Sequence, residues 1–146
     1  MITSPFWANA ATIVGRLIFA GVFGMSVAFK FMDIHMTASQ IQLVGLPFPL
    51  FLACCAAVFE LALVLAFLTG AFMTEAALAA AAYVLFLAFA FHGPANWSAN
   101  QMEFGFFVDH FSLIAGLLFA AAHGPGVFAL KLGVLPRGDW TSTAHA

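Results

Sequence analysis

The sequence predicts an all-α fold, an integral membrane bundle of four transmembrane helices, and two observations carry that prediction. Hydrophobic residues make up 64% of the chain and charged residues 7%, whereas soluble domains average about 45–50% and about 25%. Four apolar runs each approach the length of about 20 residues that crosses the hydrocarbon core of a bilayer. With 146 residues, the chain is expected to form a single membrane domain over residues 1–146.

The same composition indicates the partners. A soluble fold of this size would have to expose a large apolar patch to accommodate 19 Phe and 3 Trp. A lipid bilayer removes that difficulty because it solvates the outside of the bundle, so lipid is the first expected partner. The net charge of −2 and the absence of a basic stripe argue against nucleic acid.

The four spans are predicted at about residues 12–31, 50–69, 76–91 and 107–130. The polar residues 32–42 are interpreted as a connection that follows the first span. Pro47 and Pro49 suit the start of the second span, where a missing N–H does no harm, and Gly70 suits its C-cap. The third span is short for a bilayer, so it is expected to be longer than predicted or less tilted.

The placement of basic residues predicts the orientation. Four spans put both termini on one side of the membrane, with Arg16, Lys131 and Arg137 on that side and Lys30 on the other. Because Lys and Arg favour the cytoplasmic side, both termini are predicted to be cytoplasmic. Residues 1–11 lack the basic n-region of a cleaved signal peptide, so the first span is expected to be retained.

Two charged residues fall inside the apolar runs, Arg16 in the first and Glu60 in the second. A charge at the bilayer centre costs about 2.5–3.5 kcal/mol on insertion scales, so such residues pair or serve a function. Neighbouring spans are antiparallel and the guanidinium has a long stem, which predicts an intramembrane polar pair of Arg16 and Glu60. Either the pair is structural, or Glu60 is a protonatable carboxylate that faces a small-molecule pocket.

A second polar group gathers at the opposite, periplasmic end of the bundle. Its members are Lys30, Asp33, His35, His92, Asp109 and His110. Imidazoles beside carboxylates can relay protons or bind a metal, which makes Lys30, His92, Asp109 and His110 a candidate quinone or proton site. The alternative is an interfacial belt of polar helix ends with a Lys30–Asp109 salt bridge.

The cofactor at this end stays open between three interpretations. Two imidazoles, His92 and His110, could ligate a haem b, although neighbouring Phe and Leu leave little room. A zinc or copper site lacks an H-E-x-x-H or H-x-x-E-H spacing, so no metal ligand is assigned. Seven Phe residues around the cluster either face lipid and core or line an apolar slot for an isoprenoid quinone. They are Phe86, Phe89, Phe91, Phe104, Phe106, Phe107 and Phe111.

The order of these residues resembles the DoxX family of small four-helix bacterial membrane proteins. The resemblance covers roughly residues 12–126 and rests on Gly15-Arg16-Leu17, Phe29-Lys30-Phe31, Gly45-Leu46-Pro47, Glu60-Leu61, Gly70, His92 and Ala115-Gly116-Leu117-Leu118. Many members have a basic residue soon after the Gly70 turn, where this chain has Thr74-Glu75. Some relatives begin the fourth span with Lys-Asn, where this chain has Asp109-His110. Asp109 and His110 are therefore the positions where this protein is expected to be specialised.

Members of that family are tied to membrane-associated redox complexes, among them thiosulfate:quinone oxidoreductase and quinol oxidase systems. The resemblance implies a bacterial inner-membrane protein that is a small subunit or anchor of a quinone-linked respiratory or thiol/sulfur redox complex. Its partners would be other membrane or peripheral redox subunits, or further copies in a homo-oligomer. On this interpretation the chain is an accessory subunit of an oxidoreductase. A self-sufficient quinone-dependent oxidoreductase and a small transporter component are the two alternatives.

Overall fold

A computed structural model describes residues 5–98, 100–130 and 132–135 and confirms the all-α, four-span architecture. The elements are α1 (Pro5–Met32), α2 (Ile34–Leu43), α3 (Pro49–Thr69), α4 (Met73–His92), the short 3₁₀ helix η1 (Pro94–Asn96) and α5 (Gln101–His123). The helices α1, α3, α4 and α5 are long and apolar enough to cross a membrane. Lipid contact therefore follows from the architecture itself.

Three of the predicted spans differ from the observed helices, the first because α1 begins at Pro5, seven residues before the predicted 12. The third span is longer than predicted, because α4 covers Met73–His92. The fourth begins six residues before the predicted 107 and ends at His123 rather than 130. Asn100 sets the start, since its side chain accepts a hydrogen bond from the Met102 amide, and Gly124 (φ 80°) follows the end. Asp109 consequently lies well inside α5 instead of at its mouth.

The prediction of a polar connection after the first span is wrong in one respect, because α2 occupies Ile34–Leu43. Asp33 caps this helix through a hydrogen bond from the Met36 amide to its Oδ1 at 3.0 Å. Ala38 and Ile41, on one face of α2, are buried in a small cluster with Ala53 of α3. The apolar spacing of Ala38 and Ile41 on an otherwise polar segment is the sequence signal for this helix.

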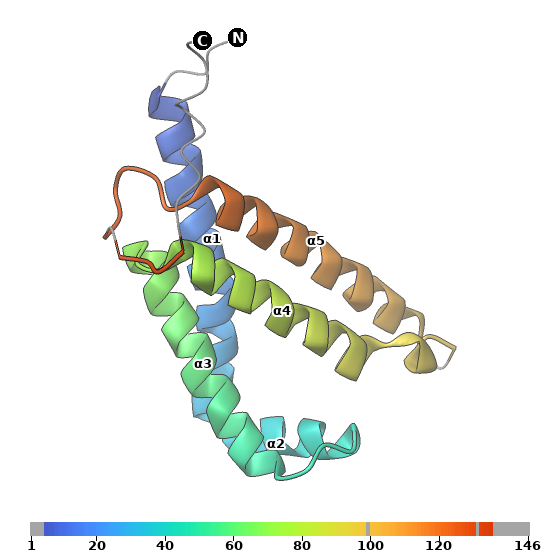
Figure 1. Ribbon diagram of the computed structural model, residues 1–146. Helices are drawn as coiled ribbons and strands as arrows, with labels where there is room; N and C mark the ends of the chain where they lie inside the picture. Colours follow the sequence, from blue (N-terminus) through green and yellow to red (C-terminus); the bar gives the residue numbers. More distant parts are fainter. Residues whose placement is uncertain (1–4, 99, 131, 136–146) are drawn as a thin grey trace.

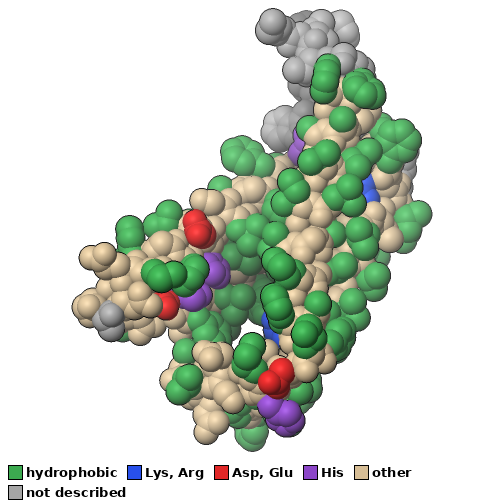
Figure 2. All heavy atoms as spheres, turned by 180° about the vertical axis from the view of Figure 1, so that it is seen from behind, with side chains coloured by type: hydrophobic (Ala, Val, Ile, Leu, Met, Phe, Trp, Pro, Cys, Tyr) green, Lys and Arg blue, Asp and Glu red, His purple; other side chains and the backbone are tan. Residues whose placement is uncertain are grey.

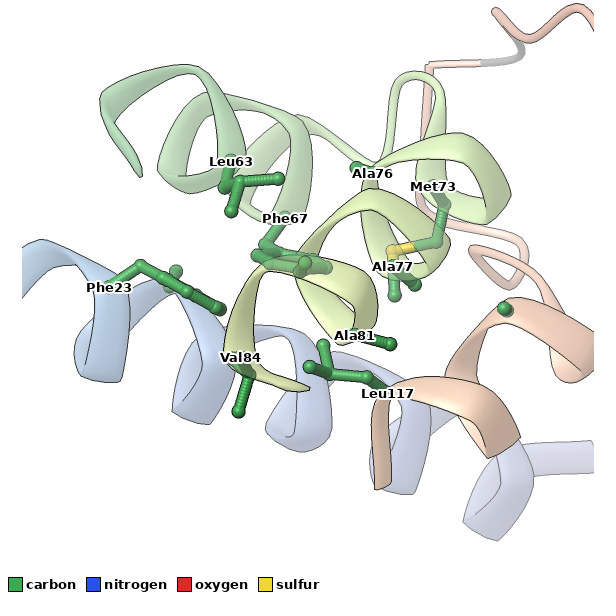
Figure 3. Packing of buried hydrophobic residues seen from close by; sticks show 12 residues of the cluster. Phe23, Leu63, Phe67, Met73, Ala76, Ala77, Ala81, Val84 and Leu117 are labelled. Atoms are coloured by element: carbon green, nitrogen blue, oxygen red, sulfur yellow. The ribbon is translucent and has the colours of Figure 1, made fainter. Parts of the chain in front are cut away.

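The main core lies where all four long helices come together, towards the end that holds the α3–α4 turn. Phe23 of α1, Phe67 of α3, Met73 of α4 and Leu117 of α5 contribute to one cluster (Figure 3). Phe67 and Leu117 are fully buried. The facing side of α4 is rich in alanine, including the completely buried Ala77, and small side chains allow the helices to approach closely.

The four long helices form two arms. One arm is the antiparallel pair α1 and α3, and the other is the antiparallel pair α4 and α5 (Figure 1). The arms meet at the main core and diverge towards the opposite end, where α2 packs against the N-terminal end of α3. Seen from behind, the surface is hollowed between the α4–α5 arm and the arm that carries α2 (Figure 2).

Candidate functional site

Glu60, near the middle of α3, is the most deeply buried Asp, Glu, Lys or Arg side chain among the described residues, and it pairs with Lys30. Lys30 Nζ lies 3.0 Å and 2.9 Å from the two Glu60 carboxylate oxygens and 2.8 Å from Ser26 Oγ. The Tyr83 hydroxyl donates to Glu60 Oε1 at 2.7 Å. The side chains of Lys30 and Glu60 are only 12% and 2% exposed. Three helices thus converge on one carboxylate.

The predicted pairing of Arg16 with Glu60 is wrong, although both residues are buried. Arg16 instead donates to backbone carbonyls of α3, from Nε to Phe67 O at 2.8 Å and from Nη2 to Leu68 O at 2.6 Å. Its Nη1 donates to Pro125 O and Phe128 O at 3.2 Å and 2.6 Å. The last carbonyls of a helix have no partner within the helix and carry partial negative charge, so they attract the guanidinium. Lys30 is therefore free to neutralise Glu60, and the predicted Lys30–Asp109 salt bridge is not formed.

A cavity of about 660 Å³ opens beside the Lys30–Glu60–Tyr83 network. Its volume is within the range of about 300–1,000 Å³ that is usual for small-molecule sites. The apolar walls come from α2, α3 and α4, including Ile41, Phe59 and Phe86. The lining also contains Ser26, Thr37 and Gln40, which add neutral hydrogen-bonding groups. An apolar space with one charged and hydrogen-bonded end suits an amphiphilic ligand.

The other three residues of the predicted quinone or proton site lie away from this cavity. His92 Nδ1 is 2.6 Å from Glu103 Oε2, and the His92 and His110 rings are 5.0 Å apart between centroids. His110 Nδ1 is 2.7 Å from Phe106 O, while Asp109 is exposed on α5. The structure thus brings His92 and His110 together and separates both from Lys30.

The histidine pair does not fit a haem. The two rings lie against each other, and Phe106 packs on His92 at 5.3 Å between ring centroids, so no space for a porphyrin separates them. In the part of the chain that the structure describes, no three His, Cys, Asp or Glu side chains gather at a metal-binding distance.

The aromatic slot predicted around the histidines is filled by the aromatic rings themselves. Phe89, Phe107 and Phe111 contact one another with centroid distances of 4.9–6.3 Å. Trp97 packs on Phe107 at 5.2 Å. Of the seven predicted Phe residues, Phe86 and Phe91 line the cavity at Lys30. The apolar cavity therefore lies beside Glu60 and is not lined by the histidines.

Two residues of these sites were missed in the sequence. Tyr83 is the single tyrosine of the chain and falls in the middle of an apolar run, which is a signal for a buried polar partner. Glu103 comes before residue 107, the predicted start of the fourth span, although α5 begins at Gln101. The Asn100 side chain, three residues before Glu103, is the capping signal that shifts this boundary.

Comparison with known families bears on both the network and the departures from the family pattern. A family model described as DoxX matches residues 11–93, which is more than half of the chain. The chain belongs to the DoxX family. No curated protein sequence and no solved structure is significantly similar to it. Arg16, Lys30, Glu60 and Tyr83 all lie in the matched segment.

The DoxX match ends after α4, so it is shorter than the resemblance over residues 12–126 and leaves α5 outside it. Asp109 and His110 therefore belong to the part of this DoxX protein that the family model does not describe. Glu75, the acidic residue after the Gly70 turn, has a structural role. Glu75 Oε1 accepts hydrogen bonds from the Val134 and Leu135 amides and so holds the segment after α5 against the start of α4.

Proposed function

We infer that this DoxX protein is an accessory subunit of a quinone-linked redox complex in a bacterial inner membrane, and that the cavity beside Glu60 holds the quinone. The observation that carries this proposal is the apolar cavity of about 660 Å³ with the buried Lys30–Glu60–Tyr83 network at its side. A quinone has an apolar isoprenoid tail and a flat ring with two carbonyl acceptors. Apolar walls suit the tail, and cationic and hydroxyl donors suit the carbonyls.

The chemistry of the network supports a role in proton handling. Reduction of a quinone to a quinol consumes two electrons and two protons, and in this proposal a partner subunit supplies the electrons. Lys30 carries a proton at Nζ, Tyr83 carries one at its hydroxyl, and both contact the Glu60 carboxylate. A carboxylate linked to two proton donors can pass a proton from one to the other.

We place the cavity near the periplasmic face and both termini in the cytoplasm. Arg16, which lies towards the terminal side of α1, supports that orientation through the positive-inside rule. Lys131 and Arg137, the other two basic residues on that side, lie outside the described residues.

Equilibrium binding of a short-chain ubiquinone to the purified chain in nanodiscs tests the proposal. Saturable binding is expected, and Lys30→Met should weaken it by about tenfold or more, since a hydrogen bond to a charged group contributes about 1.5–3 kcal/mol. His110→Gln is the matched control, because His110 does not line the cavity. Loss of ubiquinone affinity in His110→Gln, with affinity retained in Lys30→Met, would move the site back to the histidine end. Absence of saturable binding to the unmodified chain would overturn the proposal.

The adjacent cysteines provide an internal second test. Cys55 lines the cavity, whereas Cys54 is exposed on another side of α3 and does not. Bound ubiquinone should protect Cys55 from a membrane-permeant maleimide in a Cys54→Ala background. It should not protect Cys54 in a Cys55→Ala background. Reduction of quinone by the purified chain and a soluble donor, with no partner protein, would favour the self-sufficient oxidoreductase instead.

A further inference from the structure

Asp109 is a carboxylate on the outside of a membrane-spanning helix. It lies eight residues after Gln101, where α5 begins, and at 1.5 Å per residue this is about 12 Å into the helix. Its side chain is exposed in the single chain. Aspartate is too short to extend its charge to the headgroups as lysine does. A charged carboxylate that faces lipid at this depth is strongly unfavourable, so Asp109 is expected to have a partner.

The described part of the chain offers no free Lys or Arg to Asp109. Arg16 is engaged by four backbone carbonyls, and Lys30 is engaged by Glu60 and Ser26. His92 is bonded to Glu103, and the neighbouring His110 is bonded to the Phe106 carbonyl. A positive charge that neutralises Asp109 therefore has to come from a group other than Arg16, Lys30, His92 and His110.

The surface around Asp109 has room for a helix. The helices α1 and α5 approach at Phe19 and Gly116, where a Cβ on Gly116 would be 3.3 Å from the Phe19 ring. From there the two arms diverge (Figure 1), and Asp109, seven residues or about two turns before Gly116, lies on the same face of α5. We call the space between the diverging α1 and α5 the α1–α5 wedge. Gly105 and Ser112, about one turn before and after Asp109, are small and exposed, so a partner backbone can come close.

We propose that a transmembrane helix of a different protein lies along α5 in the α1–α5 wedge and places a Lys or Arg against Asp109. A different protein is favoured over a second copy because Arg16 and Lys30 of a second copy have the same internal partners, and Lys131 and Arg137 follow α5 in the sequence, beyond the end of that helix remote from Asp109. The inference rests on the proposed function only for the existence of a protein partner. It does not depend on the quinone, since the cavity is lined by residues of α1 to α4 and of the α2–α3 connection.

Site-specific photocrosslinking in native membranes tests this inference. A benzophenone amino acid replaces Gly105, where no heavy atom lies within 4 Å of an added Cβ. Leu118, exposed on α5 and about 180° away from Asp109 around the helix, is the matched control position. The expected adduct at position 105 is a transmembrane segment of another protein with Lys or Arg within one turn of the crosslinked residue. Its yield should fall by about tenfold or more in Asp109→Asn and recover when Asp109→Lys is combined with the partner's Lys or Arg→Asp.

A stability measurement on the purified chain separates docking from a structural role. Asp109→Leu should leave the chain as stable or raise its melting temperature in detergent, while it abolishes the crosslink. Destabilisation of the purified chain by Asp109→Leu would make Asp109 structural and overturn the inference. Adducts only with lipid, only with a second copy, or equal at positions 105 and 118 would also overturn it. Ubiquinone binding retained in Asp109→Asn, with the crosslink lost, would leave the proposed function intact and show that the two proposals stand separately.

Discussion

At the scale of single residues, the two charged groups inside the bundle are neutralised in different ways. Arg16 binds helix-end carbonyls, which are neutral groups with partial negative charge, and Glu60 binds a lysine and a tyrosine. Among buried side-chain nitrogen and oxygen atoms of the described residues, none lacks a hydrogen-bond partner. Substitution of each of these charged residues is therefore expected to change the free energy of unfolding.

Removal of one member of the Lys30–Glu60 pair should cost more than removal of both. Lys30→Met or Glu60→Gln leaves an uncompensated or weakly compensated buried group, which is expected to lower the free energy of unfolding by about 3–5 kcal/mol. The double variant should lose less than the sum of the single losses, because the pair's desolvation cost is removed as well. Denaturant unfolding in detergent measures the cycle. Additive losses would show that the two groups do not interact.

Replacement of Arg16 by lysine should release the segment that follows α5. The guanidinium reaches carbonyls of both α3 and residues 125–128 at once, and an ammonium has too few donors in the wrong geometry to do so. Arg16→Lys is expected to cost about 1–3 kcal/mol for carbonyls left unsatisfied. Limited proteolysis should cut faster between Gly124 and Leu135 in this variant. We call this set of Arg16 hydrogen bonds the Arg16 tether. An unchanged cleavage rate in both Arg16→Lys and Arg16→Met would show that it does not hold the segment after α5.

At the scale of helices, the turns and caps decide where each element begins and ends. Gly70 closes α3 at a φ of 74°, in the left-handed region that favours glycine. A Cβ at Gly70 would clash with the Ala129 Cβ and come within 3.0 Å of the Arg16 guanidinium carbon. The α3–α4 turn, the Arg16 tether and the end of α3 therefore all require a glycine at position 70.

Gly70→Ala should accordingly be damaging while Gly105→Ala should not. Gly70→Ala combines an unfavourable φ with a backbone-level clash, and a loss of about 1–3 kcal/mol is expected. Gly105 lies within α5 with open space around it, so alanine there should be neutral or stabilising by up to about 1 kcal/mol. Melting temperatures of the two purified variants provide the comparison. Equal effects would mean that helix propensity alone governs both positions.

The cap of α2 is expected to control the wall of the cavity. Asp33→Ala removes the hydrogen bond to the Met36 amide, at a cost of about 0.5–2 kcal/mol to the helix. Met36, Thr37 and Gln40 of α2 line the cavity, so ubiquinone affinity should fall together with helix content. Asp33→Asn keeps a capping oxygen and should retain both. Loss of affinity in both variants, with the helix content of Asp33→Asn retained, would indicate a role for the carboxylate charge instead.

At the scale of the whole molecule, the two-arm arrangement gives one end a dense core and the other an open fork. The α3–α4 turn, the Arg16 tether and the segment held by Glu75 are all at the closed end. The cavity, the histidine pair and Asp109 are in the half where the arms diverge. An open fork within a bilayer suits a protein whose ligands and partners reach it from the membrane.

The proposed orientation predicts a simple accessibility pattern. In a cysteine-free background, Ala95→Cys on η1 should react with a membrane-impermeant maleimide added to spheroplasts. Val134→Cys, which is at the closed end and exposed, should react only after the membrane is permeabilised. The reverse pattern would put both termini outside the cytoplasm and the open end of the cavity towards it.

The sequence by itself determined the class, the number of spans and the importance of the buried charges. The length, hydropathy and low charge of each segment decide whether it can cross a membrane. They can be read from the sequence because they do not depend on contacts between distant residues. The same is true of the helix ends at Gly70 and Pro49, where backbone geometry permits few residues. The Gly70 and Lys30 motifs also placed the chain in its family, which the matched segment confirms.

Only the tertiary structure decided which groups meet. Arg16 and Glu60 are on neighbouring antiparallel helices, yet the unsatisfied carbonyls at the end of α3 compete successfully for the guanidinium. Lys30 reaches Glu60 because Ser26 and the path of α1 direct it inward, and Tyr83 joins from the other arm. A pairing depends on the relative depth and rotation of packed helices, which arise from contacts between segments distant in sequence. Residue order alone leaves that geometry open.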